Sequence, residues 1–136
     1  MLGKLARGGM QVMSLDVRCL RRDVVMHETM HALGFDHTMS RLDSRKFVTV
    51  NYNNLVPGSQ NAFQQKDTYN QRYTLFDYGS IMMYPADGFS ANGEPTLVSN
   101  FPNLPVPPRN ERNDLTASDI TMVKGLYGCN NCNRSP

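Results

Sequence analysis

The spacing of apolar residues between positions 20 and 33 predicts a helix. Apolar side chains recur through this stretch, and neither glycine nor proline interrupts it. They are Leu20, Val24, Met26, Met30 and Leu33. Gly34 follows at once, and glycine is the usual residue just past a helix end because it adopts left-handed backbone angles at little steric cost. We therefore expect this helix to stop at Gly34.

A second helix is predicted to begin at Thr116, close to the end of the chain. Thr116 and Asp119 stand at the two key positions of a capping box, with aspartate in place of the commoner glutamate. An apolar face follows, formed by Ile120, Val123, Leu126 and Tyr127. Gly128 then ends the helix. We expect this helix to pack under the lower half of the domain.

The region between the two helices has the pattern of loops with short elements. Residues 47–50 form a short β-like run, and residues 51–54 are rich in turn-forming asparagine. Residues 85–114 carry most of the prolines together with many asparagines and glycines. This composition predicts an extended surface segment. It is not a linker between domains, because a helix that the fold needs follows it.

Composition limits the function classes only weakly. The chain has 136 residues, enough for one domain with a core, and a net charge of +2 with 19% charged residues, which gives no indication of nucleic-acid binding. Arg18, Arg21 and Arg22 cluster at the start of the first helix and are interpreted as a solvated face, with contact to an acidic substrate or an anionic surface as the alternative. The apolar runs fall far short of a membrane span, and no internal repeat is found.

The strongest chemical signal is the run HETMHALGFDH at residues 27–37, which holds all three histidines of the chain. On a helix, His27 and His31 share one face about 6 Å apart along the axis, so both ring nitrogens can reach one metal ion. His37 would lie about 15 Å up the axis from His27 if the helix continued. The chain must therefore turn back after Gly34 for His37 to supply a third nitrogen.

Three protein ligands leave one coordination position open, which distinguishes a catalytic zinc from a closed structural zinc. We therefore expect one zinc ion per chain on His27, His31 and His37, although three imidazoles also suit cobalt, nickel or copper. Glu28 is next to the first ligand, where its carboxylate can contact a zinc-activated water without binding the metal. As general base it would take the proton of the water and later deliver it to the leaving amine of a cleaved peptide bond.

These residues resemble a known family. HExxHxxGxxH is the zinc signature of the metzincins, and Ser80 to Tyr84 resembles the methionine turn that follows it in those proteins. The sequence around these motifs is similar to the astacin family of zinc endopeptidases. The stretches that carry this resemblance are GFDH at 34–37, Arg41, Asp43, Arg45, residues 48–52, residues 77–84, residues 115–120 and residues 126–129. The resemblance runs from about Gly3 to Cys129.

The resemblance implies an α+β fold of the metzincin or zincin-like type. Its zinc helix would pack on a partial twisted sheet, and an irregular, loop-rich C-terminal subdomain would end in a helix. It implies zinc on the three histidines and Glu28 as general base. Met82 would form the apolar floor under the ligands, and Tyr84 would bind zinc in the resting enzyme and then swing off to hydrogen-bond the oxyanion of the transition state. Without the resemblance, Met82 would be read as a core residue and Tyr84 as a packed turn residue.

Two positions depart from the family pattern. Thr38 replaces the glutamate that usually follows the third histidine and ties down the N-terminus of the mature enzyme. Met83 stands where the family usually has a histidine between methionine and tyrosine. Neither change removes a zinc ligand or the general base. Without the glutamate, however, we do not expect the mature N-terminus to be held in the way that is usual for the family after activation.

Compared with the family, the chain is short at its front. Only the last strand of the upper sheet is expected here, at residues 10–15, while the edge strand that pairs with substrate would lie upstream. Cys19 and Cys129 match two family cysteines whose disulfide partners would lie in the missing upstream segment. Cys132 has no counterpart, and a different pairing among the three cysteines, or a redox or metal role for the CNNC tail, stays an alternative. Residues 1–9 do not form a signal peptide, so we expect a fragment of a longer secreted precursor.

These observations predict residues 1–129 as an incomplete astacin-like catalytic domain and residues 130–136 as a tail. The leading hypothesis is a secreted zinc metalloendopeptidase that acts on a peptide or protein substrate, with no nucleic-acid partner and no membrane span. The alternative is a non-catalytic zinc-binding remnant or pseudoprotease that lacks the upper wall of the cleft.

Overall fold

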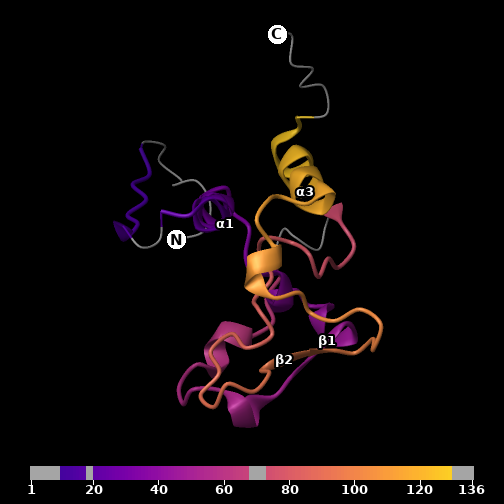
Figure 1. The fold of residues 1–136 in the computed structure, drawn as a ribbon. Coiled ribbons are helices and arrows are strands. Elements are labelled where there is room, and N and C mark those ends of the chain that lie inside the picture. Colours follow the sequence, from indigo (N-terminus) through magenta and orange to yellow (C-terminus); the bar gives the residue numbers. More distant parts are fainter. Residues whose placement is uncertain (1–9, 18–19, 68–72, 130–136) are drawn as a thin grey trace.

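The computed structural model describes residues 10–17, 20–67 and 73–129, which form two helices and a two-stranded sheet joined by loops and short 3₁₀ turns (Figure 1). The helices are α1, Arg22–Ala32, and α3, Ala117–Tyr127. The strands are β1, Val48–Val50, and β2, Leu97–Ser99. In Figure 1 the two helices lie in the upper half of the view and the sheet lies in the lower half.

The first predicted helix is confirmed as α1, although it begins later than its apolar pattern suggested. Leu20 precedes the helix and is 65% exposed, whereas Met30 is buried. The helix ends beside Gly34, whose φ of 103° is rarely adopted by residues with a side chain. The Gly34 N–H donates to the His31 carbonyl and the Phe35 N–H donates to the Met30 carbonyl, both at 3.0 Å. The chain therefore leaves α1 through a closed, tight turn.

The predicted capping box is confirmed at the start of α3. The Thr116 hydroxyl accepts from the Asp119 N–H at 3.1 Å, and the Asp119 carboxylate accepts from the Thr116 N–H at 3.0 Å. Gly128 closes the other end with a φ of 67°, in the left-handed region. Both ends of α3 are therefore satisfied by the groups that the sequence indicated.

A small apolar core joins the two helices to a turn of the chain at residues 81 and 82. Its buried members are Met30, Phe35, Ile81, Met82 and Met122. Burying a side chain of this size contributes about 1.5–3 kcal/mol relative to leaving it exposed. Within the described residues, α1 thus packs on α3 and on this turn, while the small sheet has a core of its own.

The second core lies around the sheet. β1 and β2 pair antiparallel, with Val48 opposite Ser99 and Val50 opposite Leu97. The buried residues of this core are Met39, Val48, Val50, Leu55, Phe63, Met83, Leu97 and Val106. β1 confirms the predicted β-like run, but the prediction that residues 85–114 form only an extended surface segment is wrong, because this segment supplies β2 and Val106. A strand of three residues between turns is too short to give a clear alternating pattern.

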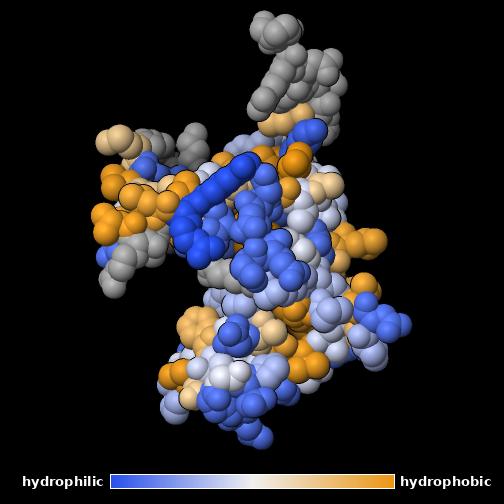
Figure 2. All heavy atoms as spheres, in the orientation of Figure 1, coloured by the Kyte–Doolittle hydropathy of each residue, from blue (hydrophilic) through white to orange (hydrophobic). Residues whose placement is uncertain are grey.

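The strand expected at residues 10–15 is also absent from the structure. These residues run as coil, and Met10 and Val12 are 87% and 85% exposed. A strand needs a neighbour for its backbone hydrogen bonds, and the two strands of the described part of the chain pair with each other instead. The apolar side chains of this segment project in the lobe at the left of Figure 2. Across the described ranges, no helix is long and apolar enough to cross a membrane.

Candidate metal centre

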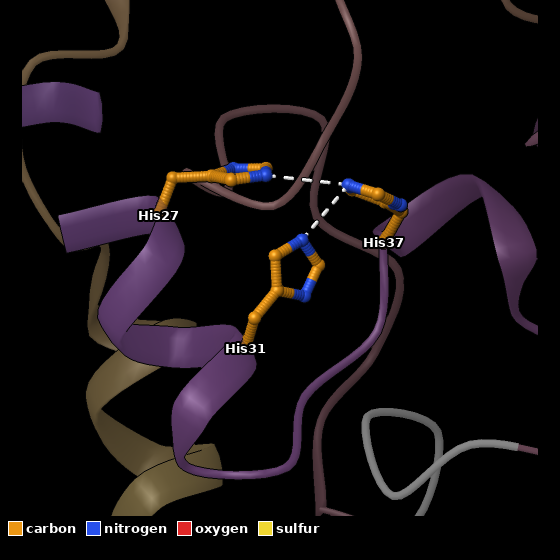
Figure 3. A group of neighbouring side chains, drawn as sticks. All are labelled: His27, His31 and His37. Atoms are coloured by element: carbon orange, nitrogen blue, oxygen red, sulfur yellow. Dashed lines mark hydrogen bonds between the residues drawn. The ribbon is translucent and has the colours of Figure 1, made fainter. Parts of the chain in front are cut away.

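The three histidines converge on one point, as the sequence predicted (Figure 3). His27 and His31 project from one face of α1, and His37 comes back toward them after the turn at Gly34. The Nε2 atom of His37 lies 3.2 Å from Nε2 of His27 and 3.1 Å from Nε2 of His31. All three candidate ligand atoms lie within 4.8 Å of one another, which is a spacing that one metal ion can bridge.

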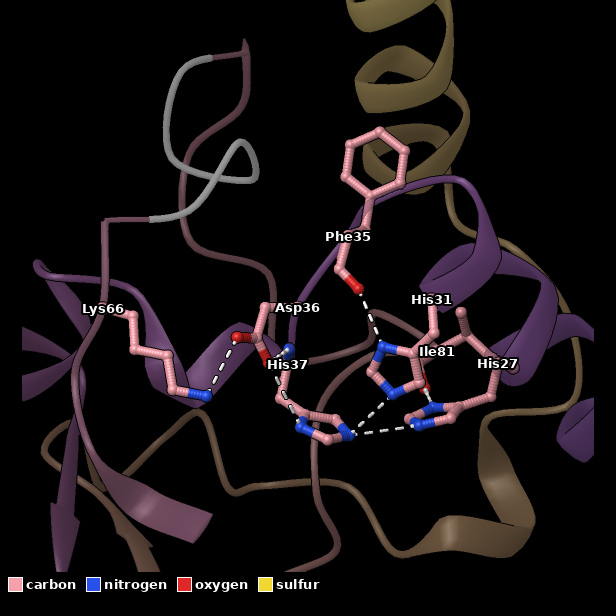
Figure 4. Close-up of polar contacts among 7 residues, drawn as sticks. All are labelled: His27, His31, Phe35, Asp36, His37, Lys66 and Ile81. Carbon is pink, nitrogen blue, oxygen red and sulfur yellow. Dashed lines mark hydrogen bonds and ion pairs between the residues drawn. The ribbon is translucent and has the colours of Figure 1, made fainter. Parts of the chain in front are cut away.

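Backbone carbonyls fix the orientation of the two histidines on α1. Nδ1 of His27 lies 2.8 Å from the Ile81 carbonyl, and Nδ1 of His31 lies 2.8 Å from the Phe35 carbonyl (Figure 4). A carbonyl oxygen can only accept, so both Nδ1 atoms carry the ring proton and both Nε2 atoms point their lone pairs at the centre. Lone pairs gathered at this distance repel one another unless a cation lies between them. The donor set therefore fits a bound zinc ion.

His37 is held as a neutral imidazole. Burial, followed by the neighbouring charges of His31 and His27, lowers its pKa from 6.5 to about 3. The Asp36 carboxylate opposes this shift. A neutral ring has a free nitrogen lone pair across the physiological pH range, as a metal ligand requires.

The methionine turn, residues 80–84, contacts the metal-binding segment through its backbone. Met82 is fully buried, and its carbonyl accepts from the Thr38 N–H at 2.9 Å, directly after the third ligand. Ser80 and Ile81 are anchored to α3, because the Asp119 carboxylate accepts from the Ser80 hydroxyl at 2.6 Å and from the Ile81 N–H at 3.1 Å. The methionine turn is thus tied to both the metal-binding loop and α3.

Tyr84 lies at the edge of the same site. Its ring centroid is 4.4 Å from that of His37, and the ring also contacts Phe63 and Phe89. Burial, followed by the negative charges of Asp36 and Glu28, raises the pKa of Tyr84 to about 12. The phenol therefore keeps its proton at neutral pH and remains a hydrogen-bond donor.

A cleft of about 1030 Å³ opens beside His31 and His37 and brings the other predicted residues together. Glu28, His31, His37 and Tyr84 all line it. The coil at residues 10–16 forms part of its lining on one side, in the place where a strand was expected. The structure therefore gathers these residues at one cleft. The wall formed by residues 10–16 is coil, where a strand was expected.

Several residues at the site were not singled out as functional by the sequence. Asp36 stands between two motif residues and contacts His37 and Lys66. Asp119 was recognised only as a helix cap, although it also binds the methionine turn. The departures Thr38 and Met83 are both buried, Met83 within the core around the sheet. Cys19 and Cys132, to which the disulfide expectations refer, lie outside the described residues.

The fold and the site together define a class, the metzincin-type domain, in which three histidine ligands are followed along the chain by a methionine turn that contacts them. Comparison with known families gives the particular branch. The profile of the peptidase family Astacin matches residues 1–128. This chain belongs to the astacin family, and His27, His31 and His37 form its zinc site.

Individual relatives agree with this assignment. The chain is 41% identical over 124 residues to the astacin-like metalloendopeptidase of Mus musculus, covering 90% of this chain and 28% of that protein. It is 37% identical over 131 residues to zinc metalloproteinase nas-15 of Caenorhabditis elegans, covering 95% of this chain and 22% of that protein.

A solved structure shows the same fold. High choriolytic enzyme 1, a hatching enzyme zinc-protease from Oryzias latipes, matches with a TM-score of 0.70 and 38% identity. The match covers 79% of this chain and 52% of that one. The chain thus spans about half of this enzyme and between 22% and 28% of the two curated relatives described above.

Proposed function

We propose that this chain carries the catalytic centre of a zinc-dependent metalloendopeptidase that hydrolyses peptide bonds in protein substrates. One observation carries the proposal: Glu28 lines the same open cleft as His31 and His37, two of the three converging histidines. A cleft that is open beside the metal is what a substrate requires, whereas a structural zinc site is closed by a fourth protein ligand. We also propose that the protein is secreted, because the family that it resembles is secreted.

The chemistry divides between the metal and the side chains. Zinc, when bound, supplies a Lewis acid that polarises the scissile carbonyl and acidifies water. Glu28, next to the ligand His27 on α1, takes the proton from the attacking water and returns it to the nitrogen of the leaving amine. One carboxylate thereby acts first as a base and then as an acid.

Tyr84 has the second chemical role in this proposal. Its phenol stays protonated because its pKa is raised to about 12. It can therefore donate a hydrogen bond to the oxyanion that forms when water adds to the carbonyl. Its position against the His37 ring places it at the side of the metal centre, within the cleft that the substrate would enter.

Met82 and Gly34 have structural roles in this proposal. Met82 is buried beneath the site and connects it to the apolar core between the helices. Gly34 provides the positive φ that returns the chain toward α1, so that His37 meets the two helical ligands. Neither residue takes part in proton transfer.

The test compares peptidase activity and zinc content in the wild type and in Glu28→Gln. We expect one zinc per chain in both proteins, and cleavage of a quenched generic peptide that falls at least about 100-fold in the variant, since general-base catalysis contributes about 10²–10⁴-fold. Glu94→Gln is the matched control, because Glu94 is exposed and lies outside the cleft lining.

The outcomes separate the two classes of function. Turnover in the wild type and in Glu94→Gln that is lost in Glu28→Gln supports the peptidase. One zinc per chain with no turnover in any of the three proteins contradicts it, and the chain would then be a zinc-binding remnant without activity. Equal turnover in all three proteins would assign the cleavage to a contaminating protease.

A further inference from the structure

We propose that Asp36 is a positioning residue of the metal centre, and that its carboxylate, anchored by Lys66, orients the His37 ring and strengthens the binding of zinc. The inference concerns the affinity of the zinc site. It would stand or fall independently of whether the chain cleaves peptides.

The position of the Asp36 carboxylate is defined by contacts on both of its oxygens (Figure 4). Oδ1 accepts from the backbone N–H of His37 at 2.8 Å and lies 3.5 Å from Nδ1 of the His37 ring. Oδ2 lies 3.2 Å from the ammonium of Lys66. The residue is only 5% exposed, although both Asp36 and Lys66 line the cleft beside the histidines.

Burying a carboxylate is costly unless it is paired, so the location of Asp36 needs an explanation. Lys66 supplies one partner, but its own side chain is 52% exposed and could follow the carboxylate to the surface. The backbone N–H of His37 supplies the other and holds the carboxylate alongside the ring. The buried position therefore serves the histidine, and Lys66 compensates part of its charge.

The three ligands are supported by different kinds of group. His27 and His31 face the carbonyls of Ile81 and Phe35 through Nδ1, whereas His37 faces a carboxylate. A negative charge on the far side of an imidazole favours the proton on Nδ1, leaves the lone pair on Nε2, and makes the ring a stronger donor to a cation. His37 is also the only ligand in the turn after α1, where its ring has no helix to hold it. The orientation of the His37 ring therefore depends most on a side-chain partner.

The experiment measures zinc affinity by competition with a chromophoric chelator at about pH 7.5, where histidine is mostly neutral. Asp36→Asn keeps the size of the side chain and an oxygen for the His37 N–H, but removes the charge. Asp36→Ala removes both. We expect the Kd for zinc to rise about 10-fold in Asp36→Asn and about 10–100-fold in Asp36→Ala, as for other carboxylates that support metal-bound histidines.

Asp114→Asn is the matched control. Asp114 also pairs with a basic side chain, that of Arg22 at 2.6 Å, but this pair is exposed on the surface. Its removal changes the net charge by the same amount, and we expect the Kd for zinc to stay within about twofold of the wild type because exposed charges are screened by salt. A cobalt(II)-substituted sample provides a second readout, since its visible spectrum reports the ligand geometry.

A purely structural role for Asp36 would lower the stability of the metal-free protein without changing the stabilisation that zinc adds. If a variant is unfolded without metal, its Kd is obtained from the zinc dependence of its unfolding transition. The inference is overturned if the wild type binds one zinc and both Asp36 variants bind it within twofold of the wild-type Kd with an unchanged cobalt spectrum. A wild type that binds no zinc would instead overturn the zinc site itself.

Discussion

Arg41 connects the loop that follows the third histidine to residues 74 and 75 through one buried guanidinium. Its side chain is 3% exposed. Nε and Nη2 each donate to the Asp43 carboxylate at 2.8 Å, and Nη1 donates to the carbonyls of Thr74 and Leu75. A bidentate pair of this kind is stronger than a single exposed ion pair, because it fixes both groups in one geometry. Asp43 is thus the acidic partner of a cation that cannot easily return to water.

This pair predicts a pH dependence of folding. The hydrogen bonds from Arg41, supported by its charge, hold the pKa of Asp43 below 3.8 in the folded state. Since the unfolded chain takes up the proton first, the stabilisation is present above about pH 4 and is lost as pH falls through the folded-state pKa. In chelator-treated protein, we expect Asp43→Asn to be less stable than the wild type at about pH 6, because the buried Arg41 then loses its charged partner. The expected loss is only about 1–2 kcal/mol, because Asp43 is partly exposed and water screens the pair.

Urea unfolding at about pH 6 and about pH 3 provides the measurement. The difference between wild type and Asp43→Asn should shrink at the lower pH, because the unfolded wild-type chain then takes up the proton on Asp43 more readily than the folded state does. Asp114→Asn serves as the control with an exposed pair. A difference between wild type and Asp43→Asn that is constant across this pH range would contradict the assignment.

Single residues also show what the sequence could and could not reveal. His27, His31 and His37 are fixed by spacing, since the period of a helix and one glycine determine where three rings can meet. Asp36 and Asp119 were missed as supporting residues, because their roles depend on Lys66 and on Ser80, which are distant in sequence. Contacts of this kind follow from the tertiary fold and leave no local pattern.

The turn after α1 is the element on which the metal site depends. Gly34 has a φ of 103°, so a side chain at this position would strain the backbone. We expect Gly34→Ala to cost about 1–2 kcal/mol of stability and, because the turn delivers His37, to weaken zinc binding as well. Unfolding of the chelated protein and a zinc competition titration measure the two effects.

Gly58 provides a close comparison for this element. It has a similar φ of 89°, and a Cβ placed there would meet nothing within 4 Å. Gly58→Ala should therefore lose a similar amount of stability while keeping the wild-type Kd for zinc. If Gly34→Ala bound zinc as tightly as Gly58→Ala, the turn would not be what positions His37.

The two helices could be predicted because capping residues and apolar spacing are local properties of the chain. The short strands were harder. β2 lies among prolines and glycines, and only its pairing with β1 defines it. Residues 10–15 were predicted as a strand but form coil, because this apolar run has no neighbouring strand to pair with. Strand formation is decided by partners, and the sequence of one segment does not contain them.

At the scale of the whole molecule, the metal should contribute to folding as well as to chemistry. The site connects α1, the loop after it and the methionine turn, so an ion bound there holds the upper half of the structure together. Zinc at about 1,000 times its Kd would stabilise the folded state by about 4 kcal/mol. For a domain of this size, removing it with a chelator should lower the Tm on the order of 10 °C.

Scanning calorimetry with added zinc and with excess chelator measures this difference. His37→Gln, which lacks one ligand, should lose most of the zinc-dependent increase in Tm. A wild-type Tm that does not respond to zinc would show that the ion is not coupled to folding.

The ligands themselves lie close together along the chain. His27 and His37 are 10 residues apart, whereas the contact of His27 with Ile81 spans 54 residues. Closing a short loop costs less chain entropy than closing a long one, and it is also faster. We therefore expect zinc to be captured early, by α1 and its turn alone, before the methionine turn arrives to complete the site. In the order of folding, the metal would then be a nucleus around which the two distant halves of the chain assemble.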